Sequence, residues 1–122
     1  MDKNRIYTII QHLAKEFQNS GVTISSVRLF GSCAAGTASY ESDIDIAVVS
    51  PDFRECEFSK RFHLLGSAII RTIRQYHTPI DVIPLTPEEY ECEQSLRMDF
   101  IRQGIEIKVT DQNQSSPGSA EV

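Results

Sequence analysis

The sequence predicts an α+β domain, a mixed α/β fold in which helices and strands alternate along the chain. Segments with apolar residues at helical spacing alternate with short apolar segments that are typical of strands. The chain has 122 residues, which is enough for one domain with a hydrophobic core. We expect this domain to cover residues 1–109. Residues 110–122 contain almost no apolar side chains, and we expect them to form a disordered tail.

The first predicted helix covers residues 3–19, where apolar side chains recur every three or four residues. Residues 22–30 are rich in β-branched and apolar side chains and predict a strand, which ends in a tight turn at Gly31 and Ser32. Residues 34–40 fit either a short helix or an ordered loop, and the pattern does not decide between them.

Residues 43–49 predict the clearest strand, with Ile44, Ile46 and Val48 on the face that should be buried. A long helix is then expected over residues 55–76. Its predicted apolar stripe consists of Phe58, Phe62, Leu65, Ile69 and Ile73.

The last elements follow from capping signals and alternation. Residues 80–85 predict a short apolar strand, and Thr86 begins a helix, interrupted in places, that reaches residue 103. Gly104 is the expected C-cap of that helix. Apolar and charged residues alternate over 105–109, which indicates a final, half-buried strand.

Composition excludes several classes of protein. The net charge of −5 argues against a general nucleic-acid binder, which would carry a basic surplus. Three widely spaced cysteines predict neither a zinc site nor a disulfide framework, so we expect reduced thiols and a cytoplasmic location. No secretory signal or membrane-spanning apolar segment is evident in the sequence.

Three aspartates are the candidate catalytic and metal-binding residues. Asp43 and Asp45 are two residues apart on one predicted strand, so both point to the same face with Cα atoms roughly 6.6 Å apart. Asp81 lies within an otherwise apolar predicted strand. Burying an unpaired carboxylate is costly, so we expect Asp81 to meet a metal ion or an arginine, or to face a polar site. Carboxylates suit Mg²⁺, which completes its coordination with phosphates and water. The set predicts metal-assisted phosphoryl or nucleotidyl transfer, with Asp81 as a further ligand or a general base.

Each of these signals has a simpler explanation when it is taken alone. Gly31 and Ser32 after a strand are commonly a plain turn, although exposed N–H groups and a hydroxyl there are able to hold a phosphate. Asp43 and Asp45 also fit the solvent-facing side of an edge strand. The functional interpretation gains weight because two adjacent strands would bring the turn and the acidic pair to one edge of the sheet.

Together, these segments resemble the minimal nucleotidyltransferase family of the DNA polymerase β superfamily. The family pattern is G-S-x-A-R-G, a short gap, S-D-[IL]-D and a later acidic residue on a strand. The matching segments are Gly31-Ser32-Cys33-Ala34-Ala35-Gly36, Ser42-Asp43-Ile44-Asp45 and Ile80-Asp81-Val82. The resemblance covers residues 1–109 and implies a mixed β-sheet of about four strands flanked by helices.

The resemblance also implies a site and a reaction. Gly31 and Ser32 would bind the nucleotide, while Asp43, Asp45 and Asp81 would bind one or two Mg²⁺ ions and catalyse the reaction. The reaction would transfer a nucleoside monophosphate, AMP from ATP, to a hydroxyl group. The acceptor would be a partner protein such as a HEPN-type toxin, for which this chain would be the antitoxin.

One position departs from the family pattern: Ala35 stands where the family has arginine, which removes a cation near the phosphates. Two alternatives therefore stay open beside the enzyme. One is a catalytically weak binding protein that neutralises its partner by occlusion. The other is a small-molecule nucleotidyltransferase of the antibiotic-modifying kind.

Overall fold

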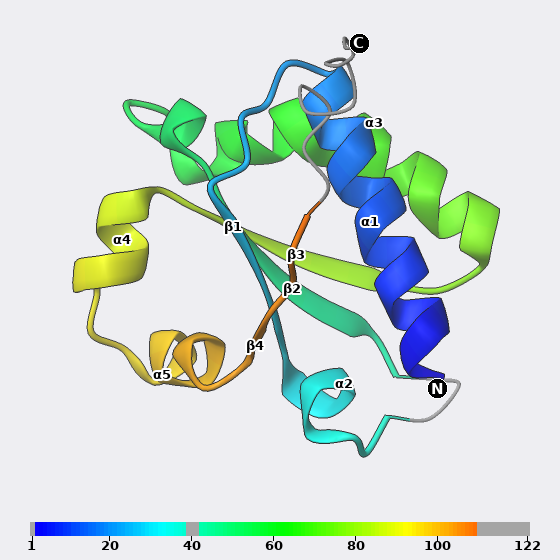
Figure 1. Ribbon diagram of the computed structural model, residues 1–122. Helices are drawn as coiled ribbons and strands as arrows, with labels where there is room; N and C mark the ends of the chain where they lie inside the picture. Colours follow the sequence, from blue (N-terminus) through cyan, green and yellow to red (C-terminus); the bar gives the residue numbers. More distant parts are fainter. Residues whose placement is uncertain (1, 39–41, 110–122) are drawn as a thin grey trace, which may run out of the picture.

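The chain forms a four-stranded mixed β-sheet with helices on both faces (Figure 1). This computed structural model describes residues 2–38 and 42–109. The helices are α1 (Lys3–Asn19), α2 (Gly31–Ala35), α3 (Phe58–Tyr76), α4 (Pro87–Cys92) and α5 (Leu96–Arg102), with a 3₁₀ helix at Pro51–Phe53. The strands are β1 (Ser26–Phe30), β2 (Ile44–Val49), β3 (Ile80–Leu85) and β4 (Ile105–Glu106). The predicted α+β class and the mixed sheet flanked by helices are confirmed.

The strand order is β3-β2-β1-β4, with β2 and β3 parallel and β1 antiparallel to both of its neighbours. Helix α3 is the crossover that the parallel pair requires. The register pairs Asp45 with Asp81 across β2 and β3, and Phe30 with Asp45 across β1 and β2. The end of β1 and the starts of β2 and β3 therefore meet at one end of the sheet.

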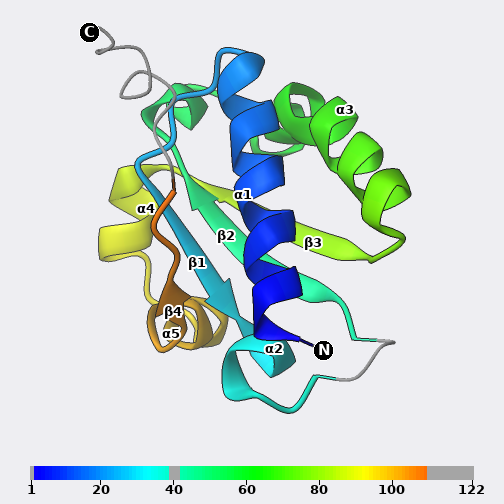
Figure 2. The same cartoon turned by 45° about the vertical axis from the view of Figure 1, so that its right-hand side comes forward.

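The two faces of the sheet are covered by different helices (Figure 2). Helices α1 and α3 pack on the face that carries Ile44, Ile46 and Val48, all of which are buried as predicted. Helix α5 covers Ala47 and Val49 on the other face through Met98 and Ile101. Among the described residues, no helix is long and apolar enough to cross a membrane.

Several predicted elements agree with the structure. Helix α1 and strand β3 have the predicted bounds. The predicted helix start at Thr86 is a complete capping box, because its hydroxyl accepts from the Glu89 N–H while the Glu89 carboxylate accepts from the Thr86 N–H. The interruption of that helix separates α4 from α5, and Ser95 caps the second piece by accepting from the Met98 N–H.

Two predicted boundaries are wrong because local hydrogen bonds and dihedral angles override the apolar pattern. Strand β1 begins at Ser26 rather than residue 22, since the Val22 N–H donates to the end of α1 and the Thr23 N–H donates to Asp52. Helix α3 begins at Phe58, because Glu55 has a left-handed φ of 61° that a helix cannot contain.

The predicted apolar stripe of the long helix is wrong at its first turns. Phe58 and Phe62 are 41% and 38% exposed and make an edge-to-face contact with each other. Arg61 lies buried between them in sequence. Its guanidinium forms an ion pair with Glu89 of α4. Arg61 is therefore buried because of this partner, which the apolar spacing of the helix does not reveal.

The remaining differences concern glycines and the last strand. Gly31 begins helix α2 instead of forming a turn, and Gly36 with φ of 80° ends it. Gly104 is not the C-cap of α5, because the helix ends at Arg102 and Gln103 is its C-cap, in the right-handed region. Gly104 is instead held close to β1, where an added Cβ would collide with the Leu29 carbonyl. Strand β4 has two residues, although Ile107 continues with a bond to β1. The predicted tail and residues 39–41 lie outside the described residues.

Candidate active site

The start of the parallel strand pair brings two of the predicted aspartates together. Asp45 on β2 and Asp81 on β3 are direct neighbours in register, so both side chains lie on the same face of the sheet. Asp45 is half-buried and Asp81 is exposed. The hydrophobic residues that flank them in each strand point to the opposite, buried face, which is what holds the two carboxylates in place.

Gly31 lies against the same carboxylate from the β1 side. Its φ is 74°, and a Cβ built on it would collide with the Asp45 side chain. Glycine is therefore needed here for two independent reasons, the left-handed backbone and the missing side chain. The predicted meeting of the Gly31-Ser32 segment with the acidic pair is a feature of this structure.

Asp43 lies just before β2 and is exposed, so it is outside the strand in which it was predicted. Its carbonyl oxygen accepts a bond of 3.5 Å from the Cys33 thiol of α2. This contact ties the α2 backbone to the segment that carries the acidic pair. Cys33 itself is buried, and burial together with the nearby Asp45 charge raises the pKa of its thiol.

The electrostatics of the site show an uncompensated negative charge. Burial raises the pKa of Asp45, and the neighbouring charges of Asp81 and Asp43 raise it further. Within residues 2–38 and 42–109, no ion pair involves any of these three aspartates. A cation bound at this point would relieve the repulsion that the pKa of Asp45 reports.

The donor set fits Mg²⁺ only in part. Hard carboxylate oxygens are the right ligands, and Mg²⁺ is commonly held by one or two of them together with substrate phosphates. No group of three or more His, Cys, Asp or Glu residues that would hold a metal ion by itself is found in the described part of the chain. Two neighbouring carboxylates with room for phosphates is therefore the arrangement that the site offers.

A pocket of about 640 Å³ lies between α2 and α5. It adjoins the carboxylates through Gly31, which lies against Asp45, and none of the three aspartates is itself among the described lining residues. Gly31 and Ser32 line it from α2, and Phe100 and Arg97 line it from α5. Its size is typical of small-ligand sites. The α5 residues were not among the predicted site residues, because their approach to α2 depends on how a short helix packs on the sheet.

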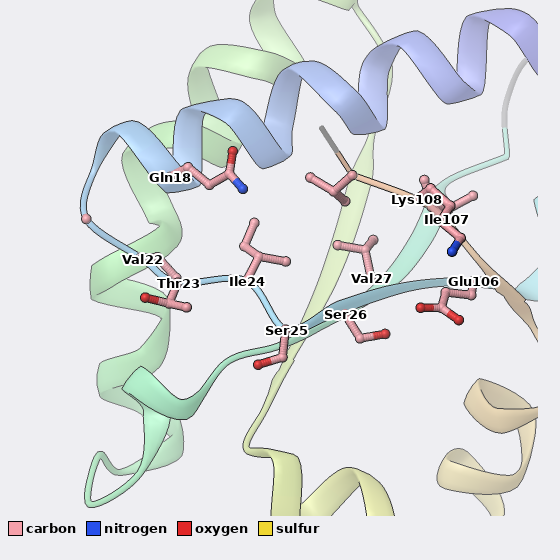
Figure 3. A pocket seen from close by; sticks show the side chains of 12 residues that line it. Gln18, Val22, Thr23, Ile24, Ser25, Ser26, Val27, Glu106, Ile107 and Lys108 are labelled. Atoms are coloured by element: carbon pink, nitrogen blue, oxygen red, sulfur yellow. The ribbon is translucent and has the colours of Figure 1, made fainter. Parts of the chain in front are cut away.

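A second pocket, of about 480 Å³, lies at the opposite end of β1 (Figure 3). Gln18, Ser26 and Lys108 are among the residues that line it. None of the predicted site residues belongs to its lining. The candidate active site is therefore at the Asp45 end of the sheet.

The family comparison matches almost the whole domain. The family model described as "Nucleotidyltransferase domain" matches residues 7–107. None of the curated proteins matches the sequence significantly.

Solved structures share the fold at low sequence identity. A candidate nucleotidyltransferase from Sulfolobus solfataricus is 23% identical with a TM-score of 0.63, over 88% of this chain and 84% of that chain. A toxin–antitoxin structure with AMP-PNP is 20% identical with a TM-score of 0.56, over 86% and 77%. The toxin–antitoxin MntA-HpeT, in a mutant with two Asp-to-Glu changes two positions apart, is 16% identical with a TM-score of 0.52, over 94% and 79%.

Proposed function

The chain belongs to the nucleotidyltransferase domain family, and we propose that it transfers a nucleoside monophosphate from a nucleoside triphosphate to a hydroxyl group, with Mg²⁺ as the metal. The observation that carries this proposal is the side-by-side placement of Asp45 and Asp81 against Gly31. Family membership supports the reaction class. The catalytic domain would be residues 1–109, acting in the cytoplasm.

In the proposed site, Asp43 and Asp45 hold the metal, and Asp81 completes the acidic set. Mg²⁺ would supply charge stabilisation for the attacking and leaving oxygens. The missing side chain of Gly31 lets the Asp45 carboxylate lie against the α2 backbone. Gly31 and Ser32 line the adjoining pocket, where a phosphate chain would meet their N–H groups and the Ser32 hydroxyl. The acceptor oxygen forms a new bond to the α-phosphorus, the bond to the β-phosphate oxygen breaks and pyrophosphate leaves. Asp81 is exposed and pairs in register with Asp45, which supports a role for it in accepting the hydroxyl proton.

ATP is the proposed donor and a protein the proposed acceptor. One structurally similar toxin–antitoxin assembly contains AMP-PNP, a non-hydrolysable relative of ATP. Two of the similar structures are toxin–antitoxin assemblies, which supports an antitoxin role toward a partner such as a HEPN-type toxin.

The test is transfer of label from α-³²P-ATP to a co-expressed partner in the presence of Mg²⁺. The double variant Asp43→Ala with Asp45→Ala is expected to lower the rate by at least about 10²-fold, since it removes the charges that hold the metal. Glu91→Gln is the matched control, because Glu91 is exposed on α4 away from the site. Equal transfer by the double variant and the wild type would disprove the assigned roles.

Neutralisation by occlusion is the second candidate function, and Ala35 favours it. Ala35 lines the pocket beside Ser32 and brings no charge to a site that would hold several phosphates. An occluding protein would still neutralise its partner after Asp43, Asp45 and Asp81 are all changed to alanine. Loss of neutralisation with retained binding would instead support catalysis.

A further inference from the structure

Among the residues that the structure describes, Arg97 is the one charged side chain that lines the pocket between α2 and α5. The same lining includes Gly31 and Ser32, so this arginine and the proposed phosphate-contacting segment share one cavity. Arg97 is exposed, and its guanidinium carbon lies 5.9 Å from the centroid of the Phe58 ring. An exposed arginine changes rotamer at small cost, so its head can turn into the pocket.

Arg97 also differs from most other arginines of the described chain in having no hydrogen-bonding or ionic partner there. The others, except Arg74, are committed to a carboxylate or to backbone carbonyls. They are Arg5, Arg28, Arg54, Arg61, Arg71 and Arg102. Arg74, which likewise has no such partner among the described residues, lies in the last turn of α3 and is absent from the pocket. Arg97 is therefore the cation that is both available and beside the candidate site.

We propose that Arg97 binds the phosphate chain of the nucleotide from the α5 side of this pocket, opposite Gly31 and Ser32. The inference rests on the proposed function, because it assumes that a triphosphate enters this site. It deepens that function by naming a phosphate-binding residue on a helix that no sequence motif singled out.

Charge balance supplies the physical reason. A triphosphate entering beside Asp43, Asp45 and Asp81 meets three carboxylates, and the chain as a whole carries a net charge of −5. Asp43, Asp45 and Asp81 would hold any metal ion, and the charge compensation it supplied would come from their side of the phosphate chain. A guanidinium on the other side matches phosphate geometry with paired N–H donors. Ala35 leaves this part of the pocket without another cation.

The test measures the binding of ATP, inorganic tripolyphosphate and adenosine by calorimetry, with Mg²⁺ present. Arg97→Ala is expected to lower the affinity for ATP and for tripolyphosphate by about 10- to 100-fold, which is the range for losing hydrogen bonds to a charged group. Adenosine affinity should not change, because adenosine carries no phosphate. Arg97→Lys should restore part of the loss. Arg74→Ala is the matched control, since it removes the same charge outside the pocket.

A charge-relocation variant separates a binding role from a structural one. Arg97→Ala combined with Ala35→Arg returns a guanidinium to the same cavity from α2 and should recover most of the lost ATP affinity. Arg97→Ala should keep the wild-type Tm, because its ring contact is on the surface.

The outcomes distinguish this inference from the proposed function. Wild-type protein that binds ATP tightly, with Arg97→Ala equal to it, would overturn the role of Arg97 and leave the function standing. Equal losses of affinity for adenosine and ATP in Arg97→Ala would also overturn the phosphate-binding role, because they would indicate that Arg97 contacts the nucleoside. A wild-type protein that binds neither ATP nor tripolyphosphate would overturn both proposals.

Discussion

The charged side chains at the two ends of β3 differ in whether they have a partner of opposite charge. Toward its end, Arg61 donates to the Pro84 carbonyl and forms a two-bond ion pair with Glu89. Toward its start, Asp81 lies beside Asp45, and the described chain offers neither carboxylate an ionic partner. The first arrangement is complete within the protein. The second leaves two neighbouring carboxylates without a positive partner in the described chain, which is why we propose it as the functional site.

The physical environments of the two ends explain the contrast. The Arg61 guanidinium is nearly buried and also lies 5.5 Å from the centroid of the Phe58 ring, so it needs a close anion. Its hydrogen bonds lower the pKa of Glu89. Burial and like charge instead raise the pKa of Asp45. The pKa shifts at the two ends therefore have opposite directions: the pKa of the paired carboxylate is lowered, and the pKa of the unpaired carboxylate is raised, first by burial and then by its acidic neighbours.

Breaking the paired end should have the largest effect on stability. Glu89→Gln leaves the buried Arg61 without its anion, and we expect a loss of about 2 kcal/mol in urea unfolding, about half the usual cost of breaking a fully buried pair because of water access to Glu89. That discount follows from a Glu89 side chain that is 35% exposed. Glu88→Gln, which touches only the exposed pair with Arg54, should leave the unfolding midpoint nearly unchanged. Equal midpoints for the two variants would contradict this view of the paired end.

Substitution of Gly31, which lies against Asp45, should have the second-largest effect on stability. Gly31→Ala strains a left-handed backbone and forces the new methyl group against Asp45, so we expect a loss larger than the usual 1–2 kcal/mol for such a backbone, together with reduced nucleotide transfer. Gly36→Ala is the matched control: its φ is 80° but nothing lies within 4 Å of its added Cβ. Transfer at the wild-type rate by Gly31→Ala would argue against a close approach of phosphate there.

Removing charge at the unpaired end should stabilise the protein slightly. Asp45→Asn ends the repulsion with Asp81 and Asp43, so the Tm in a metal-free buffer should rise while activity is lost. Mg²⁺ should raise the Tm of the wild type and have much less effect on Asp45→Asn, as expected for a ligand that binds only the folded state. A lower Tm for Asp45→Asn in metal-free buffer would show that its carboxylate is already paired.

The pH dependence of stability should distinguish the two variants, because the pKa values of Glu89 and Asp45 are shifted in opposite directions. Glu89 has a lowered folded pKa, so its stabilisation is present above the unfolded glutamate value of about 4.3 and is lost as pH falls through the folded pKa. Asp45 has a raised folded pKa. Relative to unfolded aspartate near 3.9, its contribution is favourable in acid and is lost as pH rises through the folded pKa. At pH 7, Glu89→Gln should therefore destabilise and Asp45→Asn stabilise, and both effects should vanish in acid. Unfolding curves between pH 2.5 and 7 measure this, and effects of the same sign at pH 7 would contradict it.

Local sequence patterns were enough to locate the helices that have a clear apolar period, a terminating glycine or a capping box. Helix α1 ends where predicted because its apolar period and the Gly21 stop coincide. The start of α4 follows from the Thr86 capping box, which is a local pairing of neighbouring residues. The start of α3 was misplaced because the backbone of Glu55 is left-handed, and apolar spacing carries no information on φ.

The sequence by itself determined the fold class, the bounds of α1 and β3, and the positions of Gly31, Asp45 and Asp81 in their motifs, since periodicity, caps and glycine placement act over a few residues. Tertiary structure decided which of these positions meet: Asp45 with Asp81 through the parallel register, Arg97 with Ser32 across one pocket. Partners far apart in the chain are brought together by strand pairing and helix packing, which depend on contacts between distant segments and not on the pattern within any one of them.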